Sequence, residues 1–336
     1  MRNRYLKFLF PLPLLALLSC GGSRGPEFYE KQKVLMGTLF KIKVFRGASG
    51  PGREDFSAAA EKAFGEVSRL EAEMSEWRED SPVSRAAASA GGKPVSITPD
   101  IAAVLETALA VAAETRGAFD ISFKPLGKVW NIKERKVPPG EEEIKKALGL
   151  VDYRNVVLDR ERMTLFLKKK GMSVGLGGVA KGYAAGRAGE VLKKHGMNDF
   201  IVDAGGDLFV SGSRGGSLWV TGVKNPEGGL FVKFRVKGGR AVVTSGDYEN
   251  FFIYKGEKYH HILDPRTGYP ARGLKSVTVI AENPAYADAY ATSFFVLGYE
   301  KALELVKHKK GVEFIMIDHA GNILKSPELE TAVEIF

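Results

Sequence analysis

The sequence predicts an α+β fold, an irregular mixed α/β arrangement, formed by a single large domain that follows a signal peptide and a short tether. Three observations support this. Segments of helical and of β-type periodicity are mixed without the regular alternation of a βαβ fold. Apolar residues make up 44% of the 336 residues, enough for a sizeable core. No internal repeat divides the chain, although its length alone is also compatible with two domains.

The N-terminus has the pattern of an exported lipoprotein. Arg2, Arg4 and Lys7 precede an apolar run over residues 8–18, which is too short to span a bilayer. Leu17-Leu18-Ser19-Cys20 resembles a bacterial lipobox. We therefore expect a signal peptide over residues 1–19, a tether over residues 20–33 lipidated at Cys20, and the folded domain over residues 34–336. This places the protein outside the cytoplasm, on the periplasmic or extracytoplasmic face of a membrane. An ordinary signal peptide is the alternative.

Cysteine content and charge restrict the possible functions. Cys20 is the only cysteine, so a lipidated protein has no thiol for a disulfide, a metal site or a nucleophile. The formal net charge is +9, of which Arg2, Arg4 and Lys7 carry three, leaving +6 on the remainder. The basic residues are scattered and are not interleaved with aromatic residues, so no nucleic-acid surface is predicted.

Periodicity predicts the elements of the first half. Residues 34–45 alternate as a strand does, residues 46–53 form a Gly-rich loop, and residues 54–75 have apolar side chains at helical spacing. Thr98 is suited to cap a second helix, with Pro99 in its first position, and Gly117 is placed to end it.

The second half is predicted in the same way. We expect a short helix over residues 141–148, three short strands between residues 155 and 176, and a helix over residues 179–195. Runs of β type then follow to residue 281. Helices over residues 285–297 and 301–307 precede a closing hairpin formed by residues 312–317 and 322–324.

A glycine-rich segment, Gly175 to Ala184, lies between a predicted strand and a predicted helix. Such a segment allows backbone N–H groups and a helix N-terminus to approach an anion, to which Lys181 adds a charge. The spacing of Gly175, Gly177 and Ala180 formally fits a dinucleotide-binding motif, but the upstream segment does not resemble the start of such a domain. A Walker A loop is excluded because Ala180 and Gly182 flank the lysine. A tight turn without a ligand remains the alternative.

Other polar clusters are individually ambiguous. Residues 203–207, 244–248 and 260–268 are rich in Gly, Asp and Pro, which is also ordinary turn composition. Asp288 and Thr292 are four residues apart in a predicted helix and therefore share one face. Two oxygen ligands at this spacing suit Mg²⁺, although an inward-packed Thr292 explains the pattern equally well.

Taken in order, these clusters resemble the ApbE family of FAD:protein FMN transferases. The matching segments are Met36-Gly37-Thr38-Leu39-Phe40, Met74-Ser75-Glu76-Trp77, Gly117-Ala118-Phe119-Asp120-Ile121, Leu176-Gly177-Gly178-Val179-Ala180-Lys181-Gly182-Tyr183, Gly205-Gly206-Asp207, Thr244-Ser245-Gly246-Asp247-Tyr248, His261-Ile262-Leu263-Asp264-Pro265-Arg266-Thr267-Gly268 and Ala287-Asp288-Ala289-Tyr290-Ala291-Thr292. Each motif is weak alone, but their order over residues 36–298 is specific.

The resemblance implies two sets of site residues. The first set lines the FAD site: Met36, Trp77, Ala118, Phe119, Asp120, Lys181 and Ile262. The second set, Gly178 through its carbonyl, Asp288 and Thr292, holds Mg²⁺. One departure is Gly175, where members often carry an acid. The cofactor contact there is absent, or is made by a neighbour or by the Gly175 backbone.

The implied reaction is attack of a Thr or Ser hydroxyl of a target protein on the FMN-side phosphorus of FAD, with AMP leaving. His261 is the candidate general base, with His260 as its rival. The acceptor is expected to be a subunit of a membrane redox complex. Two other functions keep the same site: an FAD pyrophosphatase that gives FMN and AMP, and a non-catalytic FAD-binding lipoprotein.

Overall fold

The computed structural model describes residues 28–47, 50, 52–329 and 333–335. The expected signal peptide and Cys20 lie outside the described residues. No helix within the described ranges is long and apolar enough to cross a membrane.

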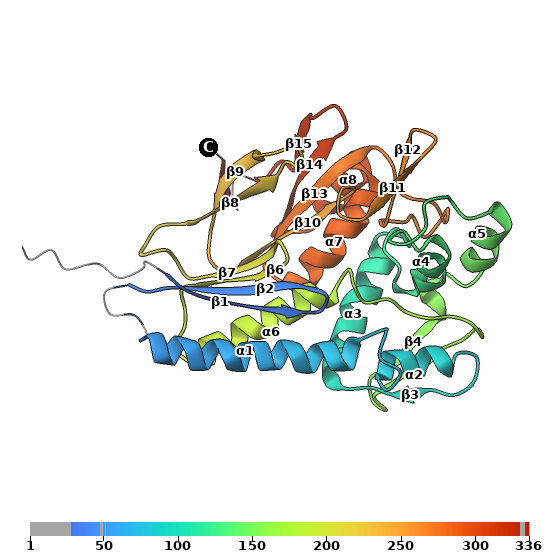
Figure 1. The fold of residues 1–336 in the computed structure, drawn as a ribbon, viewed down its shortest axis with the longest axis horizontal. Coiled ribbons are helices and arrows are strands. Elements are labelled where there is room, and N and C mark those ends of the chain that lie inside the picture. The colour runs from blue at the N-terminus through green and yellow to red at the C-terminus, as the bar shows by residue number, and fades with distance from the viewer. Residues whose placement is uncertain (1–27, 48–49, 51, 330–332, 336) are drawn as a thin grey trace, which may run out of the picture.

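The centre of the molecule is an eight-stranded antiparallel sheet (Figure 1). Its order is β1-β2-β6-β7-β10-β13-β14-β15. The strands are β1 (Phe28–Leu35), β2 (Thr38–Phe45), β6 (Phe200–Ala204), β7 (Asp207–Ser211), β10 (Arg240–Gly246), β13 (Leu274–Ala281), β14 (Val312–Asp318) and β15 (Ile323–Lys325). Since neighbouring strands are antiparallel, short turns join several of them and place polar loop residues at the sheet ends.

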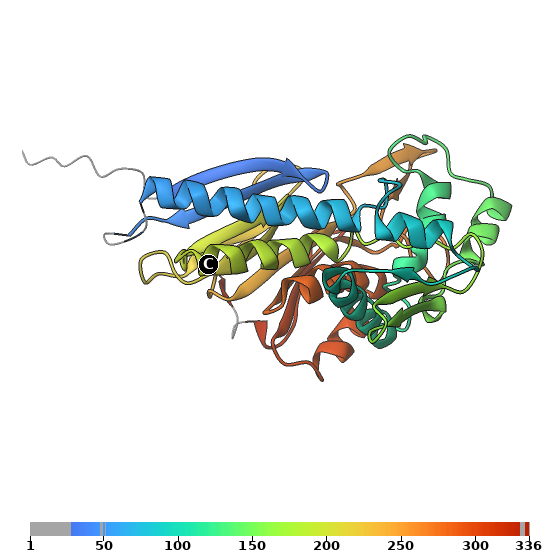
Figure 2. The ribbon, with the colours of Figure 1, turned by 90° about the horizontal axis from the view of Figure 1, so that it is seen from below.

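Four helices enclose the main core on one face of this sheet. They are α1 (Arg53–Met74), α3 (Pro99–Glu114), α6 (Ala180–Lys194) and α7 (Pro284–Leu297). Figure 2 shows α1 and α6 side by side across the sheet. The helix α1 is amphipathic and buries a stripe that includes Phe56, Phe64 and Leu70. By contrast, α7 is apolar almost all round, because it packs between the sheet and α3.

The opposite face of the sheet carries a second, smaller core. A three-stranded sheet of β8 (Trp219–Lys224), β9 (Leu230–Val236) and β16 (Val333–Ile335) covers it. Trp219 and Phe234 pack there against Ile280 and Ile315 of the central sheet. Alternating apolar residues on β9 supply this face, as a half-buried strand requires.

A third cluster lies at one end of the molecule, around Trp130. It is formed by α4 (Lys124–Trp130), α5 (Glu141–Leu148) and the ribbon of β11 (Phe251–Tyr254) and β12 (Glu257–His260). The indole N–H of Trp130 donates to the carbonyl of Gly268 at 2.7 Å. This bond fixes the loop that follows β12 against α4.

The remaining elements are short. They are α2 (Pro82–Ala88), α8 (Tyr299–Val306), the 3₁₀ turns η1 (Ile121–Phe123) and η2 (Tyr153–Asn155), and the small sheet of β3 (Val95–Ser96), β5 (Thr164–Leu167) and β4 (Val156–Asp159). The mixed α/β fold in a single domain is confirmed.

Several predicted boundaries are wrong. Residues 28–33, expected to belong to the tether, lie in β1, which begins at Phe28 and pairs with β2 along its whole length. Residues 34–45 are not one strand, since Met36 and Gly37 form a two-residue turn with φ of 51° and 72°. The polar composition of this edge strand conceals it in the sequence. The helices α2 and α4 were not predicted, and the third run expected before residue 176 is not a strand.

Candidate active site

The glycine loop leads into α6 at the centre of the candidate site. Backbone bonds hold its start, with the N–H of Gly175 donating to the carbonyl of Ile121 at 2.8 Å. Further on, a Cβ built on Gly182 would lie 2.1 Å from the carbonyl oxygen of Pro284 and 2.9 Å from the Cβ of Asp288. Only glycine therefore allows α6 and α7 to approach this closely, and the approach brings Lys181 beside Asp288.

Three charged side chains meet where α6, α7 and β7 converge. The ammonium of Lys181 lies 2.5 Å from Oδ2 of Asp207 and 3.6 Å from Oδ1 of Asp288. The backbone N–H of Gly182 donates to Oδ2 of Asp288 at 2.9 Å, and the N–H of Thr244 donates to Oδ1 of Asp207 at 3.1 Å. One cation is thus shared by two buried carboxylates, each also fixed by a backbone donor.

Burial and charge together raise the pKa values of Asp288 and Lys181. Burial raises the pKa of Asp288 to about 6, although the Lys181 ammonium opposes the shift. Desolvation lowers the pKa of Lys181, but attraction to Asp207 and Asp288 outweighs it, so the net shift is upward. Lys181 therefore stays a cation at neutral pH, available to an anionic ligand.

The three residues expected to hold Mg²⁺ lie together. Thr292 follows Asp288 by one turn of α7, and a Cβ on Gly178 would lie 3.4 Å from Oγ1 of Thr292. The hydroxyl of Ser245 is 3.3 Å from the same Oγ1. These donors are all oxygens, with one carboxylate among the three expected ligands. This composition fits Mg²⁺, which binds through one or two carboxylates together with waters and substrate phosphates.

The segment of Ala118, Phe119 and Asp120 forms another wall. Phe119 packs against the glycine loop, since a Cβ on Gly178 would lie 3.2 Å from its ring. Oδ1 of Asp120 accepts from the N–H of Ser122 at 2.7 Å, and Oδ2 accepts from the N–H of Tyr153 at 2.7 Å. Desolvation nevertheless raises the pKa of Asp120. Both carboxylate oxygens of Asp120 accept hydrogen bonds from the protein backbone. The side chain therefore holds this segment in place.

Of two further residues of the predicted FAD site, Met36 is partly buried against the main core and Trp77 is exposed. The N–H of Met36, in the β1–β2 turn, donates to Oε1 of Glu71 on α1 at 2.7 Å. Trp77 follows the end of α1 and is 80% exposed. The ammonium of Lys124 lies 3.7 Å from the centre of its indole ring, a cation–π contact. An indole that is held from one side and is open to solvent can stack on a flat ring.

The two histidines after β12 have different environments. His260 is buried, and its Nε2 lies 2.7 Å from the carbonyl of Ala271 while its Nδ1 accepts from the N–H of Ile262 at 3.3 Å. This assigns the proton to Nε2 and leaves His260 without a free basic nitrogen. The side chain of His261 is exposed. Although part of the ring is open to solvent, desolvation by the neighbouring protein lowers its pKa to about 4, and the charges of His260, Lys181 and Lys133 add to this shift. Ile262 is buried in the main core.

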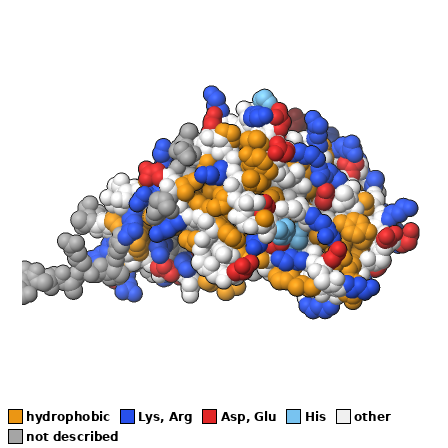
Figure 3. All heavy atoms as spheres, turned by 90° about the horizontal axis from the view of Figure 1, so that it is seen from above, with side chains coloured by type: hydrophobic (Ala, Val, Ile, Leu, Met, Phe, Trp, Pro, Cys, Tyr) orange, Lys and Arg blue, Asp and Glu red, His pale blue; other side chains and the backbone are white. Residues whose placement is uncertain are grey.

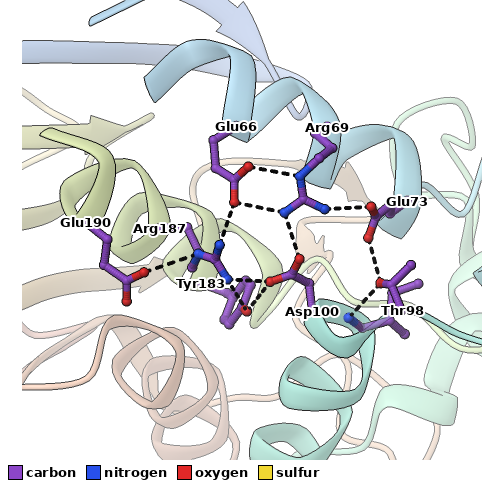
Figure 4. A network of polar contacts seen from close by, with 9 residues as sticks. Glu66, Arg69, Glu73, Thr98, Asp100, Tyr183, Arg187 and Glu190 are labelled. Atoms are coloured by element: carbon purple, nitrogen blue, oxygen red, sulfur yellow. Dashed lines mark hydrogen bonds and ion pairs between the residues drawn. The ribbon is translucent and has the colours of Figure 1, made fainter. Parts of the chain in front are cut away.

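A polar network secures the helix that carries Lys181 (Figure 4). Asp100, near the start of α3, accepts from the hydroxyl of Tyr183 at 2.6 Å and from the guanidinium of Arg187 at 2.6 Å. Its second oxygen pairs with Arg69 of α1 at 2.7 Å. Glu66, Glu73, Thr98 and Glu190 complete the network. The network joins α1, α3 and α6, and so fixes the position of the glycine loop.

Comparison with known proteins identifies this arrangement. A model of the ApbE family matches residues 36–316, which include the glycine loop, the Lys181 cluster and His261. The chain belongs to the ApbE family. A relative from Treponema pallidum, named FAD:protein FMN transferase, is 35% identical over 320 residues, which cover 89% of this chain and 87% of the relative. A relative of the same name from Klebsiella pneumoniae is 30% identical, and the match covers 89% of this chain and 92% of that relative.

The fold of solved ApbE structures agrees with this assignment. The crystal structure of the ApbE protein from Thermotoga maritima aligns with a TM-score of 0.81 at 33% identity. The alignment covers 91% of this chain and 99% of that one. The order of motifs recognised in the sequence therefore reflects true membership of the ApbE family.

Two polar residues of this ApbE site were not assigned a role from the sequence. Asp207 holds Lys181, and Ser245 lies beside Thr292. Both belong to glycine-rich clusters that the sequence already shows, but turn composition hides which side chain faces a ligand. Figure 3 shows Lys and Arg side chains interspersed with Asp and Glu over one face, so charge on this face does not indicate the site by itself.

Proposed function

We propose that this protein transfers the FMN half of FAD to a Thr or Ser hydroxyl of another protein, requires Mg²⁺ and releases AMP. The observation that carries the proposal is the placement of Lys181 between Asp207 and Asp288, next to Thr292 and the glycine loop. Relatives named FAD:protein FMN transferase, at 35% and 30% identity over most of the chain, support it.

The reaction is a phosphoryl transfer. The hydroxyl oxygen of the acceptor forms a bond to the FMN-side phosphorus of FAD, and the bond from that phosphorus to the bridging oxygen breaks. AMP leaves with the electron pair of the broken bond. Gly178, Asp288 and Thr292 would hold Mg²⁺, which would supply positive charge to the pyrophosphate. Lys181 remains protonated and stabilises the charge that develops on the phosphate, with the N-terminus of α6 adding to its field.

His261 accepts the proton of the attacking hydroxyl in this scheme. Its lowered pKa keeps the imidazole neutral near pH 7, so a lone pair is available on it. His260 is a poor alternative, because both of its ring nitrogens are engaged with the backbone. The exposure of His261 also allows a protein acceptor to approach it.

The same proposal includes export and a lipid anchor at Cys20. The lipobox-like sequence supports it, and Cys20 precedes the first described strand, which begins at Phe28, by only a few residues. An acceptor in a membrane redox complex suits this position.

The test is incubation of the purified protein with FAD, Mg²⁺ and a candidate acceptor protein. Covalent flavin fluorescence on the acceptor in a denaturing gel, with AMP in solution, is the expected result. Free FMN and AMP without labelled acceptor would identify a pyrophosphatase instead. FAD recovered unchanged in the presence of several acceptors would point to a carrier.

A further inference from the structure

Glu76 has one paired and one unpaired carboxylate oxygen. Its Oε1 forms an ion pair with the ammonium of Lys124 at 2.5 Å. Its Oε2 is buried and has no hydrogen-bond partner among the described residues. A buried polar atom without a partner costs free energy, more so when it carries charge. Such an atom at the edge of a ligand site indicates a position where the ligand supplies the missing donor.

Gly175 makes room for this carboxylate. A Cβ built on Gly175 would lie 2.9 Å from Oε2 of Glu76 and 2.9 Å from Cε1 of Phe123. Any side chain at position 175 would therefore collide with Glu76 or displace it. The Glu76 carboxylate occupies the space into which such a side chain would extend, at the start of the loop that leads to Gly178 and the metal ligands.

Lys124 fixes Glu76 and connects it to Trp77. The Lys124 side chain is only 9% exposed, and its ammonium also lies over the Trp77 ring. The Glu76–Lys124 pair borders a cavity of about 370 Å³. Ser173, which is 6% exposed and whose hydroxyl is also unpaired among the described residues, lines the same cavity. Glu76 and Ser173, each with an oxygen that is unpaired among the described residues, thus line one cavity, and they are close in sequence to Trp77 and Gly175.

We propose that Glu76 is a substrate-binding residue that accepts a hydrogen bond from a hydroxyl or N–H group of the flavin nucleotide. It does so from the space next to Gly175 that a side chain at that position would fill. The inference rests on the proposed function, because the nucleotide is the substrate of that reaction. Glu76 acts in binding rather than in the chemical step, since the reacting phosphate is assigned to the Lys181 cluster.

The test measures FAD affinity directly, by the change in flavin fluorescence on binding in the presence of Mg²⁺. Glu76→Gln is expected to raise the Kd for FAD about 10- to 100-fold, since the acceptor becomes a neutral amide and the hydrogen bond loses its charge assistance. The rate of transfer at saturating FAD should change by less than about twofold, which separates binding from chemistry. Competition with FMN and with AMP identifies the half of FAD that carries the donor, because only that half should bind more weakly.

Two further variants separate binding from an effect on folding. Glu79→Gln removes an exposed carboxylate three residues away and should leave the Kd unchanged. The double variant Glu76→Ala with Gly175→Asp places a carboxylate on the glycine loop, in the space between position 175 and position 76. It should bind FAD more tightly than Glu76→Ala alone, although its Tm should be lower because the new side chain meets the Phe123 ring.

An unchanged Kd in Glu76→Gln, or no gain in the double variant, would overturn the inference. Failure of transfer to every acceptor, with FAD binding still dependent on Glu76, would refute the proposed reaction and leave the role of Glu76 intact.

Discussion

Gly182 and Asp288 meet where α6 crosses α7, with the glycine N–H donating to Oδ2 of the aspartate at 2.9 Å. A side chain at position 182 would overlap the carbonyl of Pro284. The buried carboxylate of Asp288 and the half-buried side chain of Lys181 therefore share one site only because two helices pack with no side chain between them at this point.

The first prediction concerns this contact. Gly182→Ala should lower the free energy of unfolding by about 1–3 kcal/mol or more, because the added methyl group forces the helices apart. The rate of FMN transfer should fall by more than the loss of folded protein explains, since Lys181 moves away from Asp288. Thermal unfolding and FMN transfer measure the two effects. Gly65→Ala is the matched control, because Gly65 lies exposed in α1 with no atom near its Cβ position, and it should be neutral or stabilising. Equal effects of the two substitutions would contradict the prediction.

The second prediction concerns the metal. Asp288→Asn keeps the size of the side chain and an oxygen that can accept from Gly182, but removes the charge that Mg²⁺ needs. Transfer should be lost, and added Mg²⁺ up to millimolar concentration should not restore it. EDTA should abolish the activity of the unmodified protein in the same assay. Asp80→Asn, at an exposed position, should behave as the unmodified protein does. Full transfer by Asp288→Asn would remove Asp288 from the metal site.

The third prediction is a pH dependence of stability that arises from Asp100. Burial raises its pKa, but hydrogen bonds from Tyr183 and Arg69 and the charge of Arg187 outweigh this, so the net shift is downward. A lowered pKa gives stability that is present above the unfolded pKa of about 3.9 and is lost as the pH falls through the folded value.

Asp100→Asn should therefore lower the free energy of unfolding by about 2–3 kcal/mol at pH 7. The difference from the unmodified protein should shrink below pH 4. Denaturant unfolding at a series of pH values measures it. Glu54→Gln, an exposed substitution in the first turn of α1, serves as control. A difference that stays constant down to pH 2 would show that the effect of Asp100 is not electrostatic.

The fourth prediction concerns the general base. His261→Ala should lower the transfer rate about 10²- to 10⁴-fold and leave the Kd for FAD nearly unchanged. His308→Ala removes another exposed histidine and should have no effect. His260→Ala should instead lower the Tm, because it deletes buried bonds to Ala271 and Ile262. A fully active His261→Ala would exclude its role as the base.

The fifth prediction concerns the anchor. Cys20→Ala should release the protein from the membrane fraction of its host, whereas Ser23→Ala should not. The first described strand begins at Phe28, after both positions, and we expect neither substitution to change the Tm. Intact mass of the native protein gives an independent measure, because lipidation adds the mass of its acyl chains. An unmodified Cys20 thiol in the native host would contradict the anchor.

Local sequence patterns determined much of this protein. Thr98 and Pro99 begin α3 as predicted, and α5 spans residues 141–148, because caps and apolar spacing act within a few residues. The spacing of Asp288 and Thr292 placed both on one face of α7. The order of the motifs identified the family, which the family match confirmed. The edge strand β1 was missed because its polar residues resemble a linker until β2 pairs with it.

Only the tertiary structure decided which side chains face one another. Lys181 meets Asp207 across 26 positions, and Gly182 meets Asp288 across 106 positions. Such contacts depend on how closely α6 and α7 pack, which no local pattern specifies. The same is true of the contact between Glu76 and Gly175. The sequence shows only that a glycine stands where family members often carry an acid. The same is true also of His260 and His261, because burial and backbone partners distinguish two adjacent imidazoles that are equivalent in the sequence.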